Sequence, residues 1–402
     1  MKYKYKLSKR EWLDLIIICI TCVPGKIYKH FAKPIWLVSE RKNDAQDNGY
    51  SFFKYMRTYH PSINIYYVIS SKSEQFKKVA AIGQTIKWGG LKHHLLFWAC
   101  TYNLGAHIIE GMPSPRICHT LNNLKVYNFK NIFLQHGVTK DNIPSLSKTR
   151  NRIDLFVCVG EDEQKFVEET LLYNKGEAVS LGFSRYDYLV NSDTLKNTIL
   201  IMPTWRMWID VSSMNSQQFI QTEYYTYYNK LLMSEALANL CESYNLRVIF
   251  YLHDNLQQFT GCFSCNNKYI TIASKKYNDV QNLLKTSSIL ITDYSSVFFD
   301  FAYMHKPVIY YQFDYIQYRI KHYTEGYFSY ENDGFGPVVY TQDELIKQIK
   351  KSYDNKFGLE DKYKSKIKNF FKYNDTNNSD RIYKYVSEIT QNDRNKHNNS
   401  SV

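Results

Sequence analysis

Residues 289–300 read ILITDYSSVFFD, and this stretch indicates the fold more clearly than any other part of the chain. An apolar run typical of a buried strand passes into Thr-Asp-Tyr-Ser-Ser and then into a helical pattern. Ser295 and Ser296 therefore lie where the first helical N–H groups lack intrahelical partners and where the helix dipole favours an anion. Asp300 follows about one turn later and can accept hydrogen bonds from hydroxyl groups. The pattern suits a phosphate-plus-polyol ligand; the alternative is an ordinary capped helix.

Strands and helices alternate along most of the chain. The expected strands are 35–39, 65–69, 131–135, 154–159 and 178–181 in a first block, and 198–202, 246–252, 289–292 and 307–311 in a second. The expected helices are 163–173, 228–244, 279–286, 297–304 and 343–353. Alternation in two blocks predicts an α/β protein with two Rossmann-like, doubly wound domains. Because ligands of such sheets bind beyond the carboxyl ends of the strands, we expect the site in a cleft that the two domains face.

Composition divides the chain into an N-terminal segment, two domains and a C-terminal tail. Residues 1–33 form a basic and apolar N-terminal segment, and a polar break near 191–197 separates domains at 34–192 and 197–388. Residues 389–402 are rich in Asn, Asp, Lys and Ser, which predicts a polar disordered tail. The apolar stretch 12–23 is shorter than the roughly 20 residues that a membrane-spanning helix needs. Since basic residues flank it, it suits a segment on an anionic membrane surface; a buried N-terminal helix is the alternative.

The net charge and the cysteine content limit which partners, metals and cofactors the chain is expected to bind. The net charge of +13 suits a polyanion, although a coding bias towards Lys, Tyr, Asn and Ile explains much of the composition. No RNA-binding signature is present, so we expect no nucleic acid partner. Eight cysteines in 402 residues are not a disulfide framework, and the two C-x-x-C pairs lack further ligands for zinc. We therefore expect neither a structural metal nor a cofactor.

The residues best suited to chemistry follow expected strands. His136 leaves a strand and precedes Gly137, where a ligand can approach the backbone, and it can take a proton from an attacking hydroxyl. Arg185 follows a strand and a glycine, which suits a phosphate clamp. His253 leaves another strand. After the strand at 198–202 come a hydroxyl, an aromatic face and a guanidinium. The complete set of expected substrate-binding residues is Gln135, Gly137, Arg185, Pro203, Thr204, Trp205, Arg206, Asp293, Ser295, Ser296 and Asp300.

Several of these segments occur together in one known family. The chain resembles the CDP-glycerol glycerophosphotransferases, which are teichoic-acid and capsule polymerases of Gram-positive bacteria. The resemblance covers roughly 34–388 and lies in 36–41, 47–50, 135–137, 182–187, 203–206, 292–300 and 375–381. Four segments depart from the family pattern: Gln135 stands where Trp is common, Val138-Thr139 where Thr-Pro is common, and Ser184 where Pro is common. The fourth is Tyr251-Leu252-His253-Asp254, where the family often has Arg or Met near the second histidine, followed by an apolar residue or Pro.

The resemblance implies a GT-B type fold in which His136 and His253 are the two essential histidines. It further implies that Arg185, Pro203, Thr204, Ser295, Ser296 and Asp300 contact the nucleotide substrate. The expected enzyme transfers glycerol phosphate from CDP-glycerol to a hydroxyl of a lipid-linked glycan or growing polymer and releases CMP, at the cytoplasmic face of the membrane. The alternatives are a CDP-ribitol-dependent or nucleotide-sugar transferase on the same fold and a non-catalytic membrane-binding module.

Overall fold

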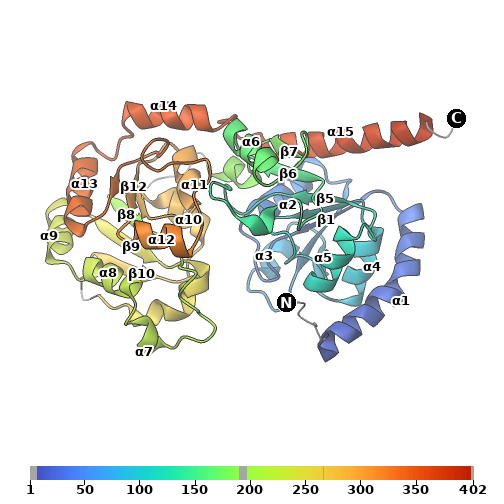
Figure 1. Ribbon diagram of the computed structural model, residues 1–402, viewed down its shortest axis with the longest axis horizontal. Helices are drawn as coiled ribbons and strands as arrows, with labels where there is room; N and C mark the ends of the chain where they lie inside the picture. Colours follow the sequence, from blue (N-terminus) through green and yellow to red (C-terminus); the bar gives the residue numbers. More distant parts are fainter. Residues whose placement is uncertain (1–6, 190–196, 266, 400–402) are drawn as a thin grey trace. The chain divides into compact units, whose positions relative to one another are not determined.

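A computed structural model describes residues 7–189, 197–265 and 267–399, and the chain divides into two compact α/β units (Figure 1). Unit 1 comprises Met1–His136, Pro144–Tyr188 and Asp375–Val402. Unit 2 comprises Gly137–Ile143 and Leu189–Asn374. The division differs from the predicted boundaries at two places: the loop after His136 belongs to unit 2, and the C-terminal segment from Asp375 belongs to unit 1.

Unit 1 contains a seven-stranded parallel sheet in the order β3-β2-β1-β4-β5-β6-β7. All five residues of the inner strand β1 are buried, as expected for an apolar strand covered on both faces. The strands are β1 (Ile35–Ser39), β2 (Asn64–Ile69), β3 (Thr85–Lys87), β4 (Tyr102–Gly105), β5 (Lys130–Phe133), β6 (Leu155–Cys158) and β7 (Ala178–Ser180). The helices are α1 (Lys9–Phe31), α2 (Asn48–Tyr59), α3 (Phe76–Ala80), α4 (Leu91–Ala99), α5 (Pro115–Asn123), α6 (Glu161–Glu169) and α15 (Asn378–Asn399), with short 3₁₀ turns η1 (Pro144–Leu146) and η2 (Ser184–Tyr188).

Unit 2 contains a six-stranded parallel sheet in the order β10-β9-β8-β11-β12-β13. The strands are β8 (Thr198–Ile201), β9 (Arg247–Tyr251), β10 (Ile270–Ala273), β11 (Ile289–Thr292), β12 (Val308–Tyr311) and β13 (Val338–Val339). The helices are α7 (Ser216–Phe219), α8 (Glu223–Leu232), α9 (Glu235–Tyr244), α10 (Val280–Thr286), α11 (Val297–Tyr303), α12 (Tyr315–Lys321), α13 (Gln342–Asp354) and α14 (Asp361–Phe370), with the 3₁₀ helix η3 (Asp254–Cys262). The single helix predicted at 228–244 is wrong, because Ser234 accepts a hydrogen bond from the N–H of Leu237 and begins a separate helix, α9.

The strand order confirms the predicted doubly wound architecture in both units. Each sheet grows outward in both directions from its first strand, so the order reverses between β1 and β4 in unit 1 and between β8 and β11 in unit 2. At such a reversal the helices that follow two neighbouring strands lie on opposite faces, which leaves space beyond the strand ends. Side chains at the carboxyl ends of the strands are therefore the candidates for a functional site.

Helix α15 replaces much of the predicted disordered tail. It continues to Asn399, whereas the sequence predicted disorder from residue 389. Its beginning is fixed by Asp187, whose carboxylate accepts hydrogen bonds from the N–H groups of Asn378 and Ser379 at 2.8 Å each. Ile382 and Val386 are buried. Once a first turn is fixed, each added residue gains a hydrogen bond, so the helix can continue into a polar segment.

Helix α1 lies along α4 and contributes to the core of unit 1 (Figure 1). Ile18 is buried, and its carbonyl accepts a hydrogen bond from Trp98 Nε1 at 3.1 Å. A Cβ added at Gly25 would lie 2.5 Å from Trp98 Cβ, so only glycine allows this approach. The alternative of a buried N-terminal helix is thus correct for one face of α1. Within the three described ranges, every helix is too short or too polar to cross a membrane.

Candidate active site

The loops after β8 and β11 are joined by one buried carboxylate. Asp293 Oδ1 accepts hydrogen bonds from the N–H of Thr204 at 2.7 Å and from the N–H of Tyr294 at 2.6 Å. Thr292 Oγ1 donates to the carbonyl of Met202 at 2.6 Å. These bonds hold the Pro-Thr-Trp-Arg segment against the Thr-Asp-Tyr-Ser-Ser segment at the point where the strand order reverses.

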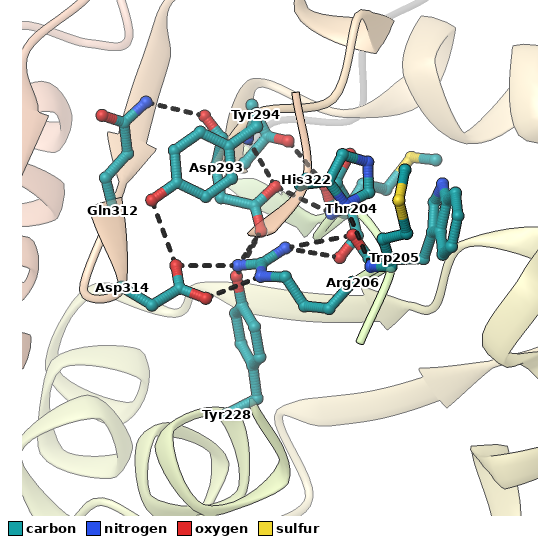
Figure 2. A network of polar contacts seen from close by, with 12 residues as sticks. Thr204, Trp205, Arg206, Tyr228, Asp293, Tyr294, Gln312, Asp314 and His322 are labelled. Carbon is teal, nitrogen blue, oxygen red and sulfur yellow. Dashed lines mark hydrogen bonds and ion pairs between the residues drawn. The ribbon is translucent and has the colours of Figure 1, made fainter. Parts of the chain in front are cut away.

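Arg206 completes this network (Figure 2). Its side chain is fully buried and lies 2.8 Å from Asp293 Oδ2, and it donates to both carboxylate oxygens of Asp314 at 2.6 and 3.0 Å. It also donates to the carbonyl of Thr204 at 2.8 Å. Burial raises the pKa of Asp293, and the Arg206 guanidinium acts against that rise. The side chains of Arg206 and Asp293 are fully buried and bond to protein atoms. We therefore infer that they hold the two loops in place.

Ser295 and Ser296 are half-buried at the beginning of α11. Ser296 is the N-cap residue, but its side chain makes no capping hydrogen bond, and Ser295 Oγ is 3.5 Å from the N–H of Val297. The capped-helix alternative therefore explains little of this serine pair. A Cβ added at Gly137 would lie 2.2 Å from Ser296 Oγ, so glycine lets the loop 137–143 pass close to the serines. Asp300, on the same helix, is only 4% exposed.

Three rings gather beside these loops in unit 2. The ring centroid of Trp205 lies 6.4 Å from that of His253 and 4.8 Å from that of His322. His253 follows β9, and its Nδ1 accepts a hydrogen bond from the N–H of Asn255 at 3.2 Å. Because an N–H can only donate, Nδ1 of His253 carries no proton and the neutral ring is protonated at Nε2.

The loop after Gly137 brings a charged cluster that the sequence did not indicate. Lys140 and Asp141 are 4 and 3% exposed and form an ion pair, and Arg319 of α12 donates to Asp141 at 2.6 Å. Burial lowers the pKa of Lys140, against the opposing effect of Asp141. Burial would raise the pKa of Asp141, but the two cations outweigh it and the pKa is lowered. The cluster ties this loop to α12 and keeps three charges beside the site.

His136 leaves β5 in unit 1 with a defined ring orientation. Its Nδ1 lies 3.3 Å from the carbonyl of Ala106, which can only accept, so Nδ1 carries the proton and Nε2 keeps its lone pair. The ring stacks on His107 at 4.4 Å with an angle of 6°. Gln135 has φ of 59°, and its buried amide donates to the carbonyl of Val157 and to Glu163. Such a backbone is costly for a residue other than glycine and is maintained by its surroundings.

Arg185 lies at the same edge of unit 1. It is 5% exposed and donates to Asp47 at 2.9 Å, and its N–H donates to Asn48 Oδ1 at 3.1 Å. The Asn48 amide in turn donates to the carbonyl of Gln135 at 2.7 Å, so one buried asparagine joins the Arg185 and His136 loops. Glu40 accepts three backbone N–H groups from the segment 46–50, and burial, with Asp47 adding to it, raises its pKa to about 7.

The predicted site residues therefore fall into two groups. Unit 1 brings together Gln135, His136 and Arg185, and unit 2 brings together Gly137, Pro203, Thr204, Trp205, Arg206, His253, Asp293, Ser295, Ser296 and Asp300. The sequence missed His107, because β4 was not recognised as a strand; its signal is Leu-Gly-Ala-His, which resembles the strand–His pattern at 133–136. It also missed Lys140, Asp141, Arg319 and His322, for which no spacing signal exists.

Comparison with known proteins decides the family. The sequence profile of the family described as "CDP-Glycerol:Poly(glycerophosphate) glycerophosphotransferase" matches residues 26–388. The chain belongs to this family. The minor teichoic acid biosynthesis protein GgaB of Bacillus subtilis (strain 168) is 32% identical to this family member over 370 residues, which cover 90% of the chain and 40% of GgaB.

A second relative and a solved structure extend the comparison. A teichoic acid poly(glycerol phosphate) polymerase of the same strain is 26% identical over 337 residues, covering 75% of the chain and 42% of the polymerase. This glycerophosphotransferase-family chain thus spans less than half the length of either curated relative. A structure of the wall teichoic acid polymerase TagF, a histidine variant soaked with CDPG, matches with a TM-score of 0.67 at 16% identity, covering 98% of this chain and 100% of that one. The likeness shows that the GT-B type fold is shared.

Proposed function

We propose that this family member transfers glycerol phosphate from CDP-glycerol to a hydroxyl of a lipid-linked glycan or growing teichoic-acid or capsule polymer. The proposal rests on two histidines at strand ends whose neutral rings carry their proton on different nitrogens. His136 offers a lone pair at Nε2, because its Nδ1–H bonds the carbonyl of Ala106. His253 offers an N–H at Nε2, because its Nδ1 accepts from Asn255. A base and a hydrogen-bond donor are the two groups that phosphoryl transfer to an alcohol needs.

The reaction balances with these two groups. The acceptor oxygen forms a bond to the β-phosphorus of CDP-glycerol while the bond from that phosphorus to the bridging oxygen breaks. His136 Nε2 takes the proton of the acceptor hydroxyl. The Nε2–H of His253 stabilises the negative charge that develops on the oxygen of the departing CMP.

Unit 2 is proposed to bind the donor. Ser295 and Ser296, at the beginning of α11, offer hydroxyls to the diphosphate. Thr204 and Trp205, held by the Asp293 network, form the neighbouring wall with Pro203, and Asp300 orients a hydroxyl of the polyol or ribose. In unit 1, Gln135 fixes the backbone before His136, and Arg185 adds positive charge on the acceptor side.

Release of CMP tests the proposal. The protein is incubated with an acceptor analogue and either CDP-glycerol or CDP-ribitol, and CMP is measured over time. We expect turnover with CDP-glycerol, and at least about 100-fold less with His136→Ala, as for a lost general base. His253→Ala should be similarly slow. The matched control is His119→Ala, which removes a unit 1 histidine that bonds Asn151. No CMP from CDP-glycerol, or full turnover in His136→Ala, would contradict the assignment.

The proposed location is the cytoplasmic face of an anionic membrane, and α1 supports it. The face of α1 that points away from α4 is apolar along its whole length, with Trp12, Leu13, Ile16, Ile20, Val23, Ile27 and Phe31 each 54–81% exposed. Their spacing of three or four residues places them in one stripe. Exposed basic residues lie at the start of the helix (Lys9 and Arg10), in its C-terminal half (Lys26) and just beyond its end (Lys33). An apolar stripe between basic ends suits a helix lying in the plane of an anionic bilayer surface.

Vesicle sedimentation tests this location. We expect the protein to sediment with phosphatidylglycerol-containing vesicles at low salt and to be partly released at high salt. The double variant Ile16→Glu/Ile20→Glu should sediment much less, whereas Leu124→Glu, at a 68% exposed position elsewhere in unit 1, should behave like the wild type. Point variants are preferable to deletion of α1, because deletion would expose the core around Trp98. Equal sedimentation of the double variant would refute the location assigned to α1.

A further inference from the structure

His322 is held in one orientation by aromatic rings on several sides. It follows α12, and its ring stacks on Tyr318 at 4.6 Å and 13°. Trp205 and Tyr323 contact it at 4.8 and 4.3 Å with steep interplanar angles of 69° and 87°. Figure 2 shows the ring beside Trp205 and Thr204, among residues of the loop after β8. A ring fixed in this way presents its two nitrogens in set directions.

One nitrogen of His322 is used by the protein and the other is not. Nδ1 accepts a hydrogen bond from the N–H of Met207 at 3.0 Å, so the proton of the neutral ring is on Nε2. Burial lowers the pKa of His322 to about 3, and the nearby Arg206 cation adds to this effect. The ring is therefore neutral near pH 7 and acts as an N–H donor. Yet Nε2 is buried, and no hydrogen-bond acceptor reaches it among the described residues.

Several charged groups lie near this N–H. Arg206, which is paired with Asp293 and Asp314, and Lys140 act on His322 as positive neighbours, and a carboxylate that opposes them is Asp141. That carboxylate is already bound by Lys140 and Arg319. A buried donor without an acceptor is unfavourable unless a ligand supplies one.

The same stack of rings leads to the serine loop. Tyr318, on which His322 stacks, stacks in turn on Tyr294 at 3.7 Å and 14°. Tyr294 immediately precedes Ser295 and Ser296. We propose that His322 is a donor-binding residue whose Nε2–H donates a hydrogen bond to the diphosphate of the nucleotide substrate. The inference rests on the proposed function and adds to it a residue that neither motif spacing nor the family resemblance indicated.

Calorimetric titration of full-length protein with three ligands tests the role of His322. The ligands are CDP-glycerol, CMP and cytidine, and the variants are His322→Phe, which keeps an aromatic ring on Tyr318 but has no N–H, and His322→Gln, which keeps an N–H. Loss of a hydrogen bond to a charged group predicts that His322→Phe binds CDP-glycerol about 10- to 100-fold more weakly. Cytidine affinity should not change, and His322→Gln should bind CDP-glycerol more tightly than His322→Phe. His119→Phe is the matched control.

The outcomes separate this inference from the proposed function. A weaker affinity for CDP-glycerol alone places the contact at the β-phosphate, and an equal loss for CMP places it at the α-phosphate. Unchanged CDP-glycerol affinity in His322→Phe, or an equal loss for cytidine, overturns the role given to His322 while leaving the enzyme's reaction intact. A wild-type protein that binds no CDP-glycerol overturns the proposed function and the ligand named here together.

Discussion

Replacing Arg206 by methionine decides whether this guanidinium binds substrate or supports the loops that do. Arg206 is fully buried between Asp293 and Asp314, at 2.6–3.0 Å from their carboxylate oxygens. Methionine fills much of the volume but leaves both carboxylates without their cation. Removal of one partner from a buried ion pair typically costs 3–5 kcal/mol, so we expect about 3–5 kcal/mol less free energy of unfolding. The loss should be as large without ligand as with it.

The loss should also depend on pH in a defined direction. Burial already raises the pKa of Asp293, and removing Arg206 removes the charge that opposes this rise. A carboxyl whose pKa is higher in the folded than in the unfolded protein stabilises the fold at low pH, and this contribution is lost as pH rises through the folded-state pKa. The gap between wild type and Arg206→Met should therefore widen from pH 5 to pH 8. Urea unfolding followed by circular dichroism measures it.

Two results would refute this assignment. Arg247→Met, at an exposed position at the start of β9, is the control and should change the free energy of unfolding by less than about 0.5 kcal/mol. If Arg206→Met unfolds within about 1 kcal/mol of the wild type, the buried network does not have the role that its geometry indicates. If that stable variant also binds CDP-glycerol more than 10-fold more weakly, Arg206 is a ligand contact, as the sequence suggested.

Three further predictions concern the two strand-end edges. His107→Phe should keep kcat within about threefold of the wild type, because a ring still stacks on His136. His107→Ala should lower kcat about 10-fold or more with little change in KM for CDP-glycerol. Equal kcat in the wild type and both variants would exclude a positioning role for His107. Ser295→Ala/Ser296→Ala should weaken CDP-glycerol binding in calorimetry about 10-fold while lowering the unfolding free energy by about 1 kcal/mol or less, and unchanged affinity would leave the serines a purely structural part. Since burial raises the pKa of Glu40 from 4.5 to about 7, the stability of the wild type relative to Glu40→Gln should fall by about 1.4 kcal/mol per pH unit between those values in urea unfolding, and a flat difference would contradict that shift.

The fold was predictable because the central strands are buried on both faces and therefore read as apolar runs. β1 and β11 begin and end where the sequence predicted. β4 was missed because it has the sequence Tyr-Asn-Leu-Gly, with a polar residue in its centre. Asn103 is nonetheless buried there, because its amide donates to Asn131 of β5 at 2.9 Å. A strand stabilised by a side-chain contact across the sheet cannot be recognised from its own four residues.

The candidate site was predictable in its location but not in how its polar atoms are used. In open α/β sheets, residues just after strand ends meet at one edge, so Thr204, Asp293 and Ser296 were expected at a common edge, and the structure joins Thr204 to Asp293 there. The same reasoning grouped Arg206 with the substrate contacts, whereas the structure shows its guanidinium bonded to Asp293, Asp314 and a carbonyl. Whether a charged residue faces a ligand or another side chain depends on partners that come from remote parts of the chain.

The three histidines show how the backbone group beside a ring, and not the residue type alone, sets what the side chain can do. As residue types, His136, His253 and His322 are identical, and two of them follow strands in the same way. The backbone group that meets Nδ1 differs: a carbonyl for His136, and an N–H for each of the other two. A carbonyl leaves Nε2 as a base, and an N–H leaves it as a donor. One base and two donors can therefore arise from one residue type, and under the proposed function a substitution that alters the local backbone around His136 removes the base while every histidine is retained.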